Sequence, residues 1–338
     1  MHRCLGLAAL AAGHVAPNPM VGSVLVFEDR IIGEGFHEIH GKAHAEVNCI
    51  NSVAPEDQHL IQRSTIYVSL EPCAHHGKTP PCADLIIEKR IPRVVIGCRD
   101  PFPLVNGKGI EKLEAAGIEV TVGVLEKECQ QINRRFFTFN TQHRPYIILK
   151  WAQSANGIIA RPGERTSISN EYTNRLVHKW RSEEASILVG PRTALIDNPA
   201  LTTRLWTGLD PIRLVIDKHL ELPDHLHLFN NKAKTIVFNT IRHEPGTNPG
   251  YYLIAEDSSL VNQLLIAIHQ LKIQSVLVEG GARLLQSFID AEAWDEARII
   301  TNNELVLPAG LPAPRLTQAH LQSHENLLSD TIRYYDHD

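Results

Sequence analysis

The 338-residue sequence lacks the features of membrane and nucleic-acid-binding proteins. No stretch approaches the roughly 20 apolar residues that a membrane-spanning helix requires. No run of Lys and Arg is long enough to follow a phosphate backbone, and the formal net charge of -5 provides no positive surface for nucleic acid. We therefore expect neither a membrane nor a nucleic acid as partner.

Cysteine is also sparse, because only six Cys residues are spread through the chain, without a secretory context. A disulfide framework is therefore not expected, and a reducing cytoplasm fits this pattern. The opening MHRCLGLAALAAG contains an apolar run at the short end for a signal peptide. Leu5, Ala8, Ala9 and Ala12 instead follow helical spacing, which predicts a first helix with one buried face.

What the chain does contain is short β-rich runs that alternate with helical patterns. Its length predicts two domains, since one domain usually has roughly 100 to 200 residues. In the first series, strands are predicted at 21–27, 30–36, 64–70, 93–98 and 118–123, and helices at 44–54, 82–90, 107–116 and 125–137. The polar segment 139–145 interrupts this series. We therefore predict one domain over residues 1–143 and a second over 144–338.

The second series has the same character. Strands are predicted at 146–152, 185–190, 212–217, 234–239, 275–281 and 297–301, and helices at about 170–183, 258–270 and 281–290. Both domains are thus predicted to be α/β, with helices packed on a central sheet. Prolines interrupt the last forty residues, which predicts irregular structure there with one closing strand at 331–335.

One group of residues has the composition of a catalytic zinc site. His44 and Glu46 open a predicted helix, Cys73 follows the strand at 64–70, and Cys82 comes nine positions later. One imidazole and two thiolates leave Zn²⁺ an open position for water, whose pKa falls from ~15.7 toward ~7. Glu46 would then move protons from the water to the ring nitrogen and the leaving amine. These residues predict hydrolytic deamination of an amino-pyrimidine or a related base.

The residues alone leave other ligand sets open. The H-x-E and P-C-x-x-C signature of zinc deaminases has two residues between its cysteines, whereas eight residues, AHHGKTPP, separate Cys73 from Cys82. His75 and His76 in this segment are rival ligands. A structural zinc site is the other alternative, although it would more often have a fourth Cys or His and would need no adjacent carboxylate.

Four segments of the first domain share a more specific pattern: APNPMVG (16–22), GFH (35–37), HAE (44–46) and LEPCAHHGKTPPC (70–82). Together they resemble the deaminase half of the bifunctional riboflavin-biosynthesis deaminase/reductase family. The resemblance implies a cytidine-deaminase-like fold and a diaminopyrimidinone substrate that carries a ribosylamino 5′-phosphate. It also implies that zinc binds His44, Cys73 and Cys82, that Glu46 is catalytic, and that the substrate pocket contains Asn18, His37, His76 and Lys78.

The second domain has no G-x-G-x-x-G fingerprint or P-loop after any predicted strand, so a standard dinucleotide or NTPase fold is not supported. The strand at 275–281 instead ends in Glu279-Gly280-Gly281 and passes directly into a helix. Glycines at such a turn let a phosphate approach the helix N-terminus. An ordinary strand-to-helix turn would have the same pattern.

Residues 144–154, 190–204 and 278–281 are similar to the reductase half of the same family. The similarity implies a dihydrofolate-reductase-like fold, NADPH-dependent reduction of the opened ribose to a ribityl chain, and a homo-oligomer, either dimer or tetramer. The implied substrate contacts are Lys150, Arg181, Leu201, Arg204 and Glu279. The implied NADPH contacts are Ala152, Ser167, Thr193, Asp197, Gly281, Ala282, Arg283, Leu284, Leu285, Gln286 and Ser287.

Three departures from the family pattern concern the reductase. Asn156 stands where the family usually has Asp in a Ser-x-Asp-Gly turn, Ser167 occupies a position that can be aromatic, and the C-terminal tail is short. Two other functions therefore stay open at this point. One is an active zinc deaminase with a degenerate reductase half, and the other is a nonenzymatic zinc module that binds protein or nucleic acid.

Overall fold

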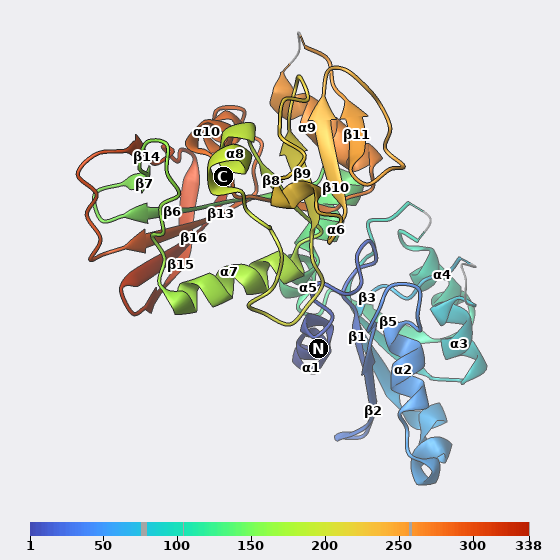
Figure 1. Cartoon of the computed structure of the whole chain (residues 1–338). Coiled ribbons are helices and arrows are strands. Elements are labelled where there is room, and N and C mark those ends of the chain that lie inside the picture. Colours follow the sequence, from blue (N-terminus) through green and yellow to red (C-terminus); the bar gives the residue numbers. More distant parts are fainter. Residues whose placement is uncertain (76–79, 104, 257–258, 338) are drawn as a thin grey trace. The chain divides into compact units, whose positions relative to one another are not determined.

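A computed structural model describes residues 1–75, 80–103, 105–256 and 259–337 (Figure 1). The chain divides into two compact units, Met1–His143 and Arg144–Asp338, and each unit has its own sheet and hydrophobic core. Among the described residues, no helix is long and apolar enough to cross a membrane.

The first unit is built on a sheet with the strand order β2-β1-β3-β4-β5 in the described part of the chain. These strands are β1 (Gly22–Phe27), β2 (Arg30–Phe36), β3 (Thr65–Leu70), β4 (Arg93–Cys98) and β5 (Glu119–Val122). β1 pairs antiparallel with β2 and β3, whereas β3, β4 and β5 run parallel. The loops that follow β3 and β4 therefore leave the sheet at the same edge, and the first of these loops contains Cys73.

Helices cover both faces of this sheet. On one face lie α2 (Ala45–Asn51), α3 (Cys82–Glu88) and α4 (Lys108–Ala115), whose apolar side chains share a core with β1, β3 and β4. On the other face lie α1 (His2–Ala9) and α5 (Glu126–Ile132). The remaining elements are the 3-10 helix η1 (Pro55–Arg63) and α6 (Arg134–Thr141).

Two glycines allow α2 to pack very closely on β2. A Cβ atom on Gly35 would lie 2.4 Å from the backbone N of Cys49, and one on Gly33 would lie 2.5 Å from the Cys49 carbonyl oxygen. Real Cβ contacts are not this short, so any larger residue would displace the helix. The glycines thereby fix the helix whose first turn contains Glu46.

The first helix is present, but its predicted buried face was wrong by about one residue. Ala9 is exposed and Leu5 and Ala12 are half-buried, whereas the buried set is Cys4, Leu7, Ala8 and Ala11. Both sets have helical spacing, and the uniformly apolar segment gave no polar residues to distinguish them. Two residues of this set, Cys4 and Leu7, pack against Val24 of β1.

The second unit is built on a larger sheet with the order β11-β10-β9-β8-β12-β6-β13-β16-β15 over the described residues. Its strands are β6 (Tyr146–Ser154), β8 (Ser186–Val189), β9 (Ile212–Ile216), β10 (Thr235–Asn239), β11 (Gly250–Leu253), β12 (Ser275–Val278), β13 (Glu296–Asn302), β15 (Ala319–Leu327) and β16 (Asp330–His337). Strands β11 through β13 in this order run parallel, and β16 and β15 are antiparallel. Short strands β7 (Ile158–Ala160) and β14 (Leu311–Pro312) pair separately.

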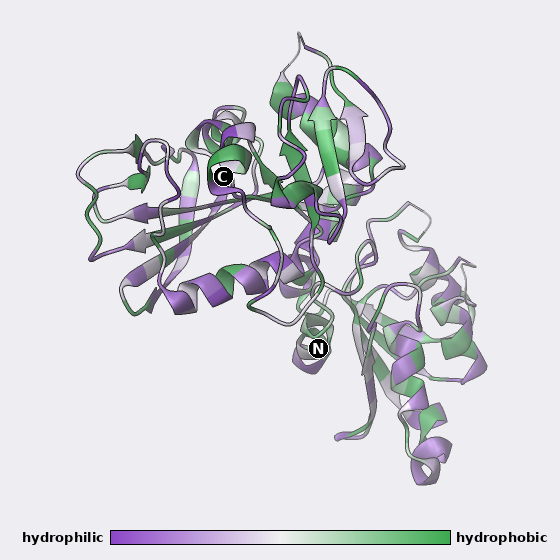
Figure 2. Cartoon of the chain, viewed as in Figure 1, coloured by the Kyte–Doolittle hydropathy of each residue, from purple (hydrophilic) through white to green (hydrophobic). Residues whose placement is uncertain are grey.

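The parallel strands are buried on both faces, which explains their continuous apolar sequences. Ile147 and Leu149 of β6 pack in the core that contains α9 (Leu260–Gln270) and α10 (Ala282–Asp290). Tyr146 and Ile148 pack on the opposite face with α7 (Glu171–Glu183), and α8 (Pro191–Asp197) lies against β8 and β9. Figure 2 shows the hydrophobic colouring of β9 and β10 and the more polar colouring of β15, which is the edge strand at the other end of the sheet.

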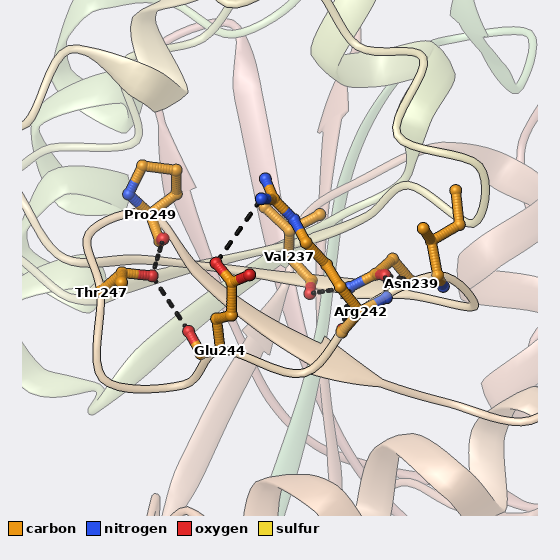
Figure 3. A network of polar contacts seen from close by, with 7 residues as sticks. Val237, Asn239, Arg242, Glu244, Thr247 and Pro249 are labelled. Carbon is orange, nitrogen blue, oxygen red and sulfur yellow. Dashed lines mark hydrogen bonds and ion pairs between the residues drawn. The ribbon is translucent and has the colours of Figure 1, made fainter.

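A network of polar contacts holds the loop between β10 and β11 (Figure 3). The 3-10 helix η2 (His227–Phe229) precedes β10 in the chain. Asn239 Nδ2 donates to the carbonyl of Arg242 at 3.1 Å, and Asn239 Oδ1 accepts from the Arg242 N–H at 2.8 Å. Thr247 Oγ1 donates to the carbonyl of Pro249 at 2.6 Å. The loop at this edge is thus held by its own side chains.

The predicted closing strand at 331–335 lies within β16, but the prediction of irregular structure before it missed β15. The structure has a hairpin there, in which β15 pairs with β16 and β16 pairs with β13. Nearly all side chains of β15 are exposed, so the strand has no alternation of buried and exposed residues that the sequence could have revealed. At the end of the first unit, α6 also extends to Thr141, into the polar segment predicted to interrupt the helical pattern.

The turn at Asn156 is formed, and its left-handed residue is the glycine that follows. Gly157, with a φ of 77°, adopts the left-handed conformation, so Asn156 does not need to. Ser154 Oγ donates to Asn156 Oδ1 at 2.8 Å, and the Asn156 amide donates to the Leu307 carbonyl at 2.8 Å and accepts from the Leu307 N–H at 3.2 Å. The amide can pair with both backbone groups of Leu307, whereas a carboxylate could pair with only one.

We expect Phe288→Ala to lower the free energy of unfolding of the second unit by about 3–5 kcal/mol, the range for large cavities in a core. Phe288 of α10 is fully buried in the main core. Ile266→Ala is the control, because Ile266 on α9 is 58% exposed and its loss should cost less than about 0.5 kcal/mol. Urea unfolding measures both values. An equal effect of the two substitutions would contradict the core assignment.

Candidate functional site

Three side chains from separate segments converge in the first unit. His44 Nδ1 lies 3.3 Å from Cys82 Sγ and 3.6 Å from Cys73 Sγ. Their ligand atoms all lie within 4.8 Å of one another. Within the described ranges, no other group of three or more His, Cys, Asp and Glu side chains is arranged to hold a metal ion. Tetrahedral zinc with bonds of about 2.0–2.3 Å would separate an N and an S ligand by about 3.5 Å. The donor set and its spacing therefore fit zinc.

The local fold explains how these segments meet. His44 is the N-cap of α2 and has an extended backbone, with a φ of -76° and a ψ of 166°. This conformation places His44 outside the regular helix, so that His44 and Glu46 do not diverge as residues i and i+2 of a helix would. Cys82 is the first residue of α3, and its backbone N–H donates to Cys73 Sγ at 3.3 Å.

Electrostatics favour a thiolate in this cluster. A hydrogen bond with Cys82 lowers the pKa of Cys73 to about 4; burial opposes this shift and His44 adds to it. The shared proton correspondingly raises the pKa of Cys82. Thiolates are the form in which cysteines bind metals.

Glu46 is buried beside this cluster, with 3% of its surface exposed. Burial, together with the charge of Cys73, raises the pKa of its carboxyl to about 7. A carboxyl group with a pKa near neutrality can both accept and release a proton, as a general acid–base requires.

Asn18 and His37 form a pair next to the cluster. Asn18 Nδ2 lies 3.0 Å from His37 Nε2, and His37 Nδ1 lies 2.9 Å from the carbonyl oxygen of Ala43. The carbonyl can only accept, so Nδ1 bears the proton and Nε2 accepts from Asn18. Burial lowers the pKa of His37, in agreement with a neutral ring. Its ring centroid lies 5.4 Å from that of His44.

The other predicted pocket residues of this unit, His76 and Lys78, lie outside the described residues. The rival ligand His75 is described, and it is not in the metal cluster. Its ring lies 6.3 Å from that of Phe102, and its Nδ1 has no hydrogen-bond partner among the described residues.

Sequence reasoning assigned no role to Glu71, whose side chain anchors the loop after β4. Its carboxylate accepts hydrogen bonds from the backbone N–H groups of Gly109 at 2.9 Å, Gly107 at 3.0 Å and Asp100 at 3.3 Å. Glu71 is buried and lies two residues before Cys73. The sequence shows an acidic residue at the end of a predicted strand, which could have suggested a structural role. Its three N–H partners are 29 to 38 residues away and could not be foreseen.

The second unit contains a buried ion cluster made of three of the predicted substrate contacts. Arg181 Nε and Nη2 donate to the two Glu279 oxygens at 2.9 and 2.7 Å, and Lys150 Nζ lies 3.8 Å from Glu279 Oε2. Burial alone would raise the pKa of Glu279, but Arg181 and then Lys150 outweigh it and hold the pKa at about 2. Burial lowers the pKa of Lys150.

The remaining predicted substrate contacts have different environments. Arg204 is exposed and close enough to Arg181 for the two charges to repel, which adds to the effect of burial in lowering its pKa. Leu201, with a φ of 53°, is buried and packs in the core with Val189 and Ala194. The structure thus brings Arg204 near the ion cluster and places the Leu201 side chain in the core.

The predicted NADPH contacts differ in their exposure to solvent. A Cβ atom on Gly280 would lie 2.6 Å from Val189 Cα, and one on Gly281 would lie 3.3 Å from Thr193 Oγ1, so the glycine turn lies against β8 and α8. Asp197 is half-buried on α8, Ala152 is half-buried on β6, and Arg283 and Ser167 are exposed. Ala282, Leu284 and Leu285 are buried, while Gln286 and Ser287 bond to the Arg315 carbonyl and the Leu284 carbonyl.

His178 is a residue of this region that the sequence analysis missed. It lies one turn before Arg181 on α7, and only 4% of it is exposed. Burial, with the charges of Arg181 and Arg204, lowers the pKa of the ring to about 4, and Nδ1 has no hydrogen-bond partner in the described part of the chain. The sequence could have indicated its burial, because His178 lies on the apolar face of the predicted helix, between Val177 and Trp180.

The fold and these sites define a two-domain protein with a zinc-deaminase centre in one unit and a reductase-type unit in the other. Residues 1–98 match the family model of the cytidine and deoxycytidylate deaminase zinc-binding region, and residues 145–306 match that of the RibD C-terminal domain. The "Riboflavin biosynthesis protein RibD" of Aquifex aeolicus is 40% identical over 301 residues, which cover 87% of this chain and 83% of that protein. The corresponding protein of Escherichia coli is 34% identical over 316 residues, with coverages of 88% and 84%. The chain therefore belongs to the RibD family of bifunctional riboflavin-biosynthesis proteins.

Solved structures agree with this assignment. A diaminohydroxyphosphoribosylaminopyrimidine deaminase/5-amino-6-(5-phosphoribosylamino)uracil reductase from Thermotoga maritima is similar with a TM-score of 0.90 and 36% identity, over 100% of this chain and 97% of that one. RibD of Acinetobacter baumannii has a TM-score of 0.88 and 29% identity, with coverages of 99% and 97%. The predicted cytidine-deaminase-like and dihydrofolate-reductase-like folds are confirmed.

We expect Cys73→Ser to lose stoichiometric zinc, because a neutral hydroxyl is a poor replacement for a thiolate ligand. Cys98→Ala is the control and should keep the metal, since Cys98 is a buried thiol bonded to the Ser69 carbonyl and is not in the cluster. Elemental analysis of the purified proteins measures zinc per chain. Stoichiometric zinc in Cys73→Ser would move the ligand assignment to His75 or His76.

Proposed function

We propose that this chain catalyses two successive reactions of riboflavin biosynthesis. In the first unit, 2,5-diamino-6-ribosylamino-4(3H)-pyrimidinone 5′-phosphate is hydrolytically deaminated. In the second unit, the ribosyl group of the product is reduced to a ribityl chain with NADPH. The observation that carries the proposal is the buried set of His44, Cys73, Cys82 and Glu46 in a chain whose other half is a reductase domain of the RibD family.

The deaminase step is assigned to the residues around the metal cluster. His44, Cys73 and Cys82 would hold zinc, which when bound makes water a nucleophile near neutral pH. Glu46 takes a proton from the attacking water and delivers it to the ring nitrogen and then to the leaving ammonia. Burial supports this role, because it keeps the carboxyl group from being permanently ionised.

Asn18 and His37 are proposed to hold the pyrimidine, together with His76 and Lys78. The Asn18 amide donates one hydrogen to His37, which leaves its second N–H and its carbonyl oxygen for a polar ring edge. The neutral His37 ring and its bond to Ala43 fix the orientation of this amide. A defined orientation of the base brings its amino-bearing carbon to the reacting position.

In the second unit, Lys150 and Glu279 are proposed to contact the sugar chain of the substrate. Arg181 donates two hydrogen bonds to Glu279, and its Nη1 donates a third to the Thr202 carbonyl at 3.4 Å. Arg181 therefore serves mainly to keep Glu279 ionised and oriented, and the exposed fork of Arg204 is better suited to the 5′-phosphate. Leu201 is proposed to support this wall of the pocket from the core.

NADPH supplies the reducing equivalents, and the glycine turn that opens α10 is proposed to receive its phosphates. The first N–H groups of α10 have no side-chain cap, and Gly281 lies against Thr193, so the backbone can approach an anion closely. Ala152, Ser167, Asp197 and residues 281–287 complete the proposed contact set. The buried Leu284 and Leu285 would act by holding this turn in place.

A cytoplasmic homo-oligomer, dimer or tetramer, completes the proposal, with no nucleic acid as partner. The six cysteines form no disulfide bond, which is compatible with a reducing compartment. Size-exclusion chromatography with light scattering tests the assembly.

We expect Glu46→Gln to keep zinc and to lower the rate of ammonia release by about 10²–10⁴-fold, the usual contribution of a general acid–base. The amide has the same shape as the carboxyl group but cannot shuttle the proton. Metal analysis and an ammonia assay on the diaminopyrimidinone phosphate measure both effects. Unchanged turnover would refute the catalytic assignment and favour a zinc module without this chemistry.

We expect Arg181→Met to lower NADPH oxidation by at least tenfold, a change of about 1.4 kcal/mol, while ammonia release stays at the wild-type rate. Burial then acts on Glu279 without its main opposing charge, so the pKa of that carboxyl rises from about 2. In the wild type, Glu279 stabilises the folded state fully at pH values above the ordinary pKa of a glutamate. This contribution is lost as the pH falls toward 2, where the carboxylate of the folded protein becomes protonated.

The matched control for this variant is Arg175→Met, on the exposed face of the same helix. It should leave both activities unchanged. Wild-type protein that releases ammonia yet never consumes NADPH would instead identify the second unit as a degenerate, scaffold-like reductase.

A further inference from the structure

Asn18, one of the residues proposed to hold the pyrimidine, lies on a loop that is poor in backbone donors. Within residues 17–20, Pro17 and Pro19 have no N–H group. Asn18 N–H donates to the Val15 carbonyl at 2.8 Å. The N–H of Met20 is then the remaining backbone donor in this part of the loop, and its partner decides where the loop lies.

That partner is a side chain 113 residues further along the chain. Met20 N–H donates to Asn133 Oδ1 at 2.8 Å, and Asn133 Nδ2 donates to the Met20 carbonyl at 2.9 Å. One amide therefore pairs with both backbone groups of one residue, as a neighbouring strand would. Asn133 is buried, with 2% of its surface exposed, so water does not compete for these bonds.

The usual role for an asparagine at this position is not the one observed. Asn133 is the N-cap of α6, where an asparagine side chain would ordinarily accept from an N–H group of the first turn. Its side chain makes no capping hydrogen bond. Both of its polar groups go to Met20 instead, so local helix capping does not account for the residue.

The contact between Asn133 and Met20 lies next to the Asn18–His37 pair, which is proposed to hold the substrate. Asn18 lies two residues before Met20 and donates to His37, and the backbone N–H of His37 donates to the carbonyl of Val21 at 2.9 Å, one residue after Met20. Asn18 and His37 are thus tied to the segment on both sides of Met20. A shift of Met20 would move the amide that faces the base.

We propose that Asn133 is a positioning residue of the deaminase, which sets the Asn18–His37 pair through Met20. The proposal rests on the deaminase function proposed above. It also assigns a role to the elements after residue 98, where the match to the common deaminase zinc-binding region ends. The metal ligands and Glu46 lie within that region, whereas the residue that fixes the substrate loop lies outside it.

The test is Asn133→Ala in the full chain, with Asn140→Ala as the matched control. Asn140 lies on α6, and its side chain donates to the Phe136 carbonyl of its own helix at 2.8 Å. We expect Asn133→Ala to lower kcat/KM for ammonia release by about 10- to 100-fold, as misplacement of a substrate group does. Zinc content and NADPH oxidation with the deaminated product should stay at wild-type values. Asn140→Ala should leave all three unchanged.

Hydrogen exchange gives a readout that does not depend on activity. In a peptide that covers residues 17–24, the Met20 amide should exchange faster in Asn133→Ala than in the wild type or in Asn140→Ala. If Asn133→Ala fails to fold, Asn133→Gln decides, because it keeps both polar groups one methylene further out and should give an intermediate loss of kcat/KM.

Wild-type kcat/KM and unchanged exchange in both Asn133 variants would overturn the proposal. An equal loss in Asn140→Ala, or a parallel loss of zinc, would do the same, because the effect would then be general destabilisation. If wild-type protein released no ammonia, the function proposed above would fail, and the exchange of the Met20 amide would still decide whether Asn133 holds the loop.

Discussion

The convergence of one imidazole and two sulfur atoms at a single edge of the first sheet is the constraint on which the deaminase depends. None of the three side chains comes from the regular part of a strand. His44 precedes α2, Cys73 follows β3 and Cys82 begins α3, so the geometry is set by where the helices begin. Glycines under α2 fix one of these starting points, and the buried carboxylate of Glu71 ties the segment before Cys73 to the loop after β4.

The second unit uses charge in a different way. Its buried carboxylate, Glu279, stays ionised because Arg181 and Lys150 lie beside it, and Arg181 lowers its pKa more than Lys150 does. The same arrangement uses up most of the hydrogen-bonding capacity of Arg181. In the two units, then, buried ionisable groups are tuned in opposite directions, toward neutrality at Glu46 and toward permanent charge at Glu279.

The sequence revealed the elements and chemistry that leave a local pattern. Most parallel strands of both sheets were predicted closely from continuous apolar runs, although β11 was missed. The grouping of His44, Cys73 and Cys82 was predicted from residue type and spacing. Features with no local pattern were missed. The exposed strand β15 has no alternation, and the buried face of α1 was displaced because its residues are uniformly apolar. Pairings across long separations, such as those of Glu71 and Asn133, depend on the folded backbone and could not be read from the sequence.

The amide of Asn156 has a consequence for the environments in which the second unit keeps its shape. It joins the turn after β6 to Leu307, at the end of a segment that follows β13. An amide has no proton to gain or lose between mildly acidic and mildly alkaline conditions. The link between these two segments should therefore be insensitive to acidity, whereas an aspartate at this position would introduce a charge that must be matched by donors alone.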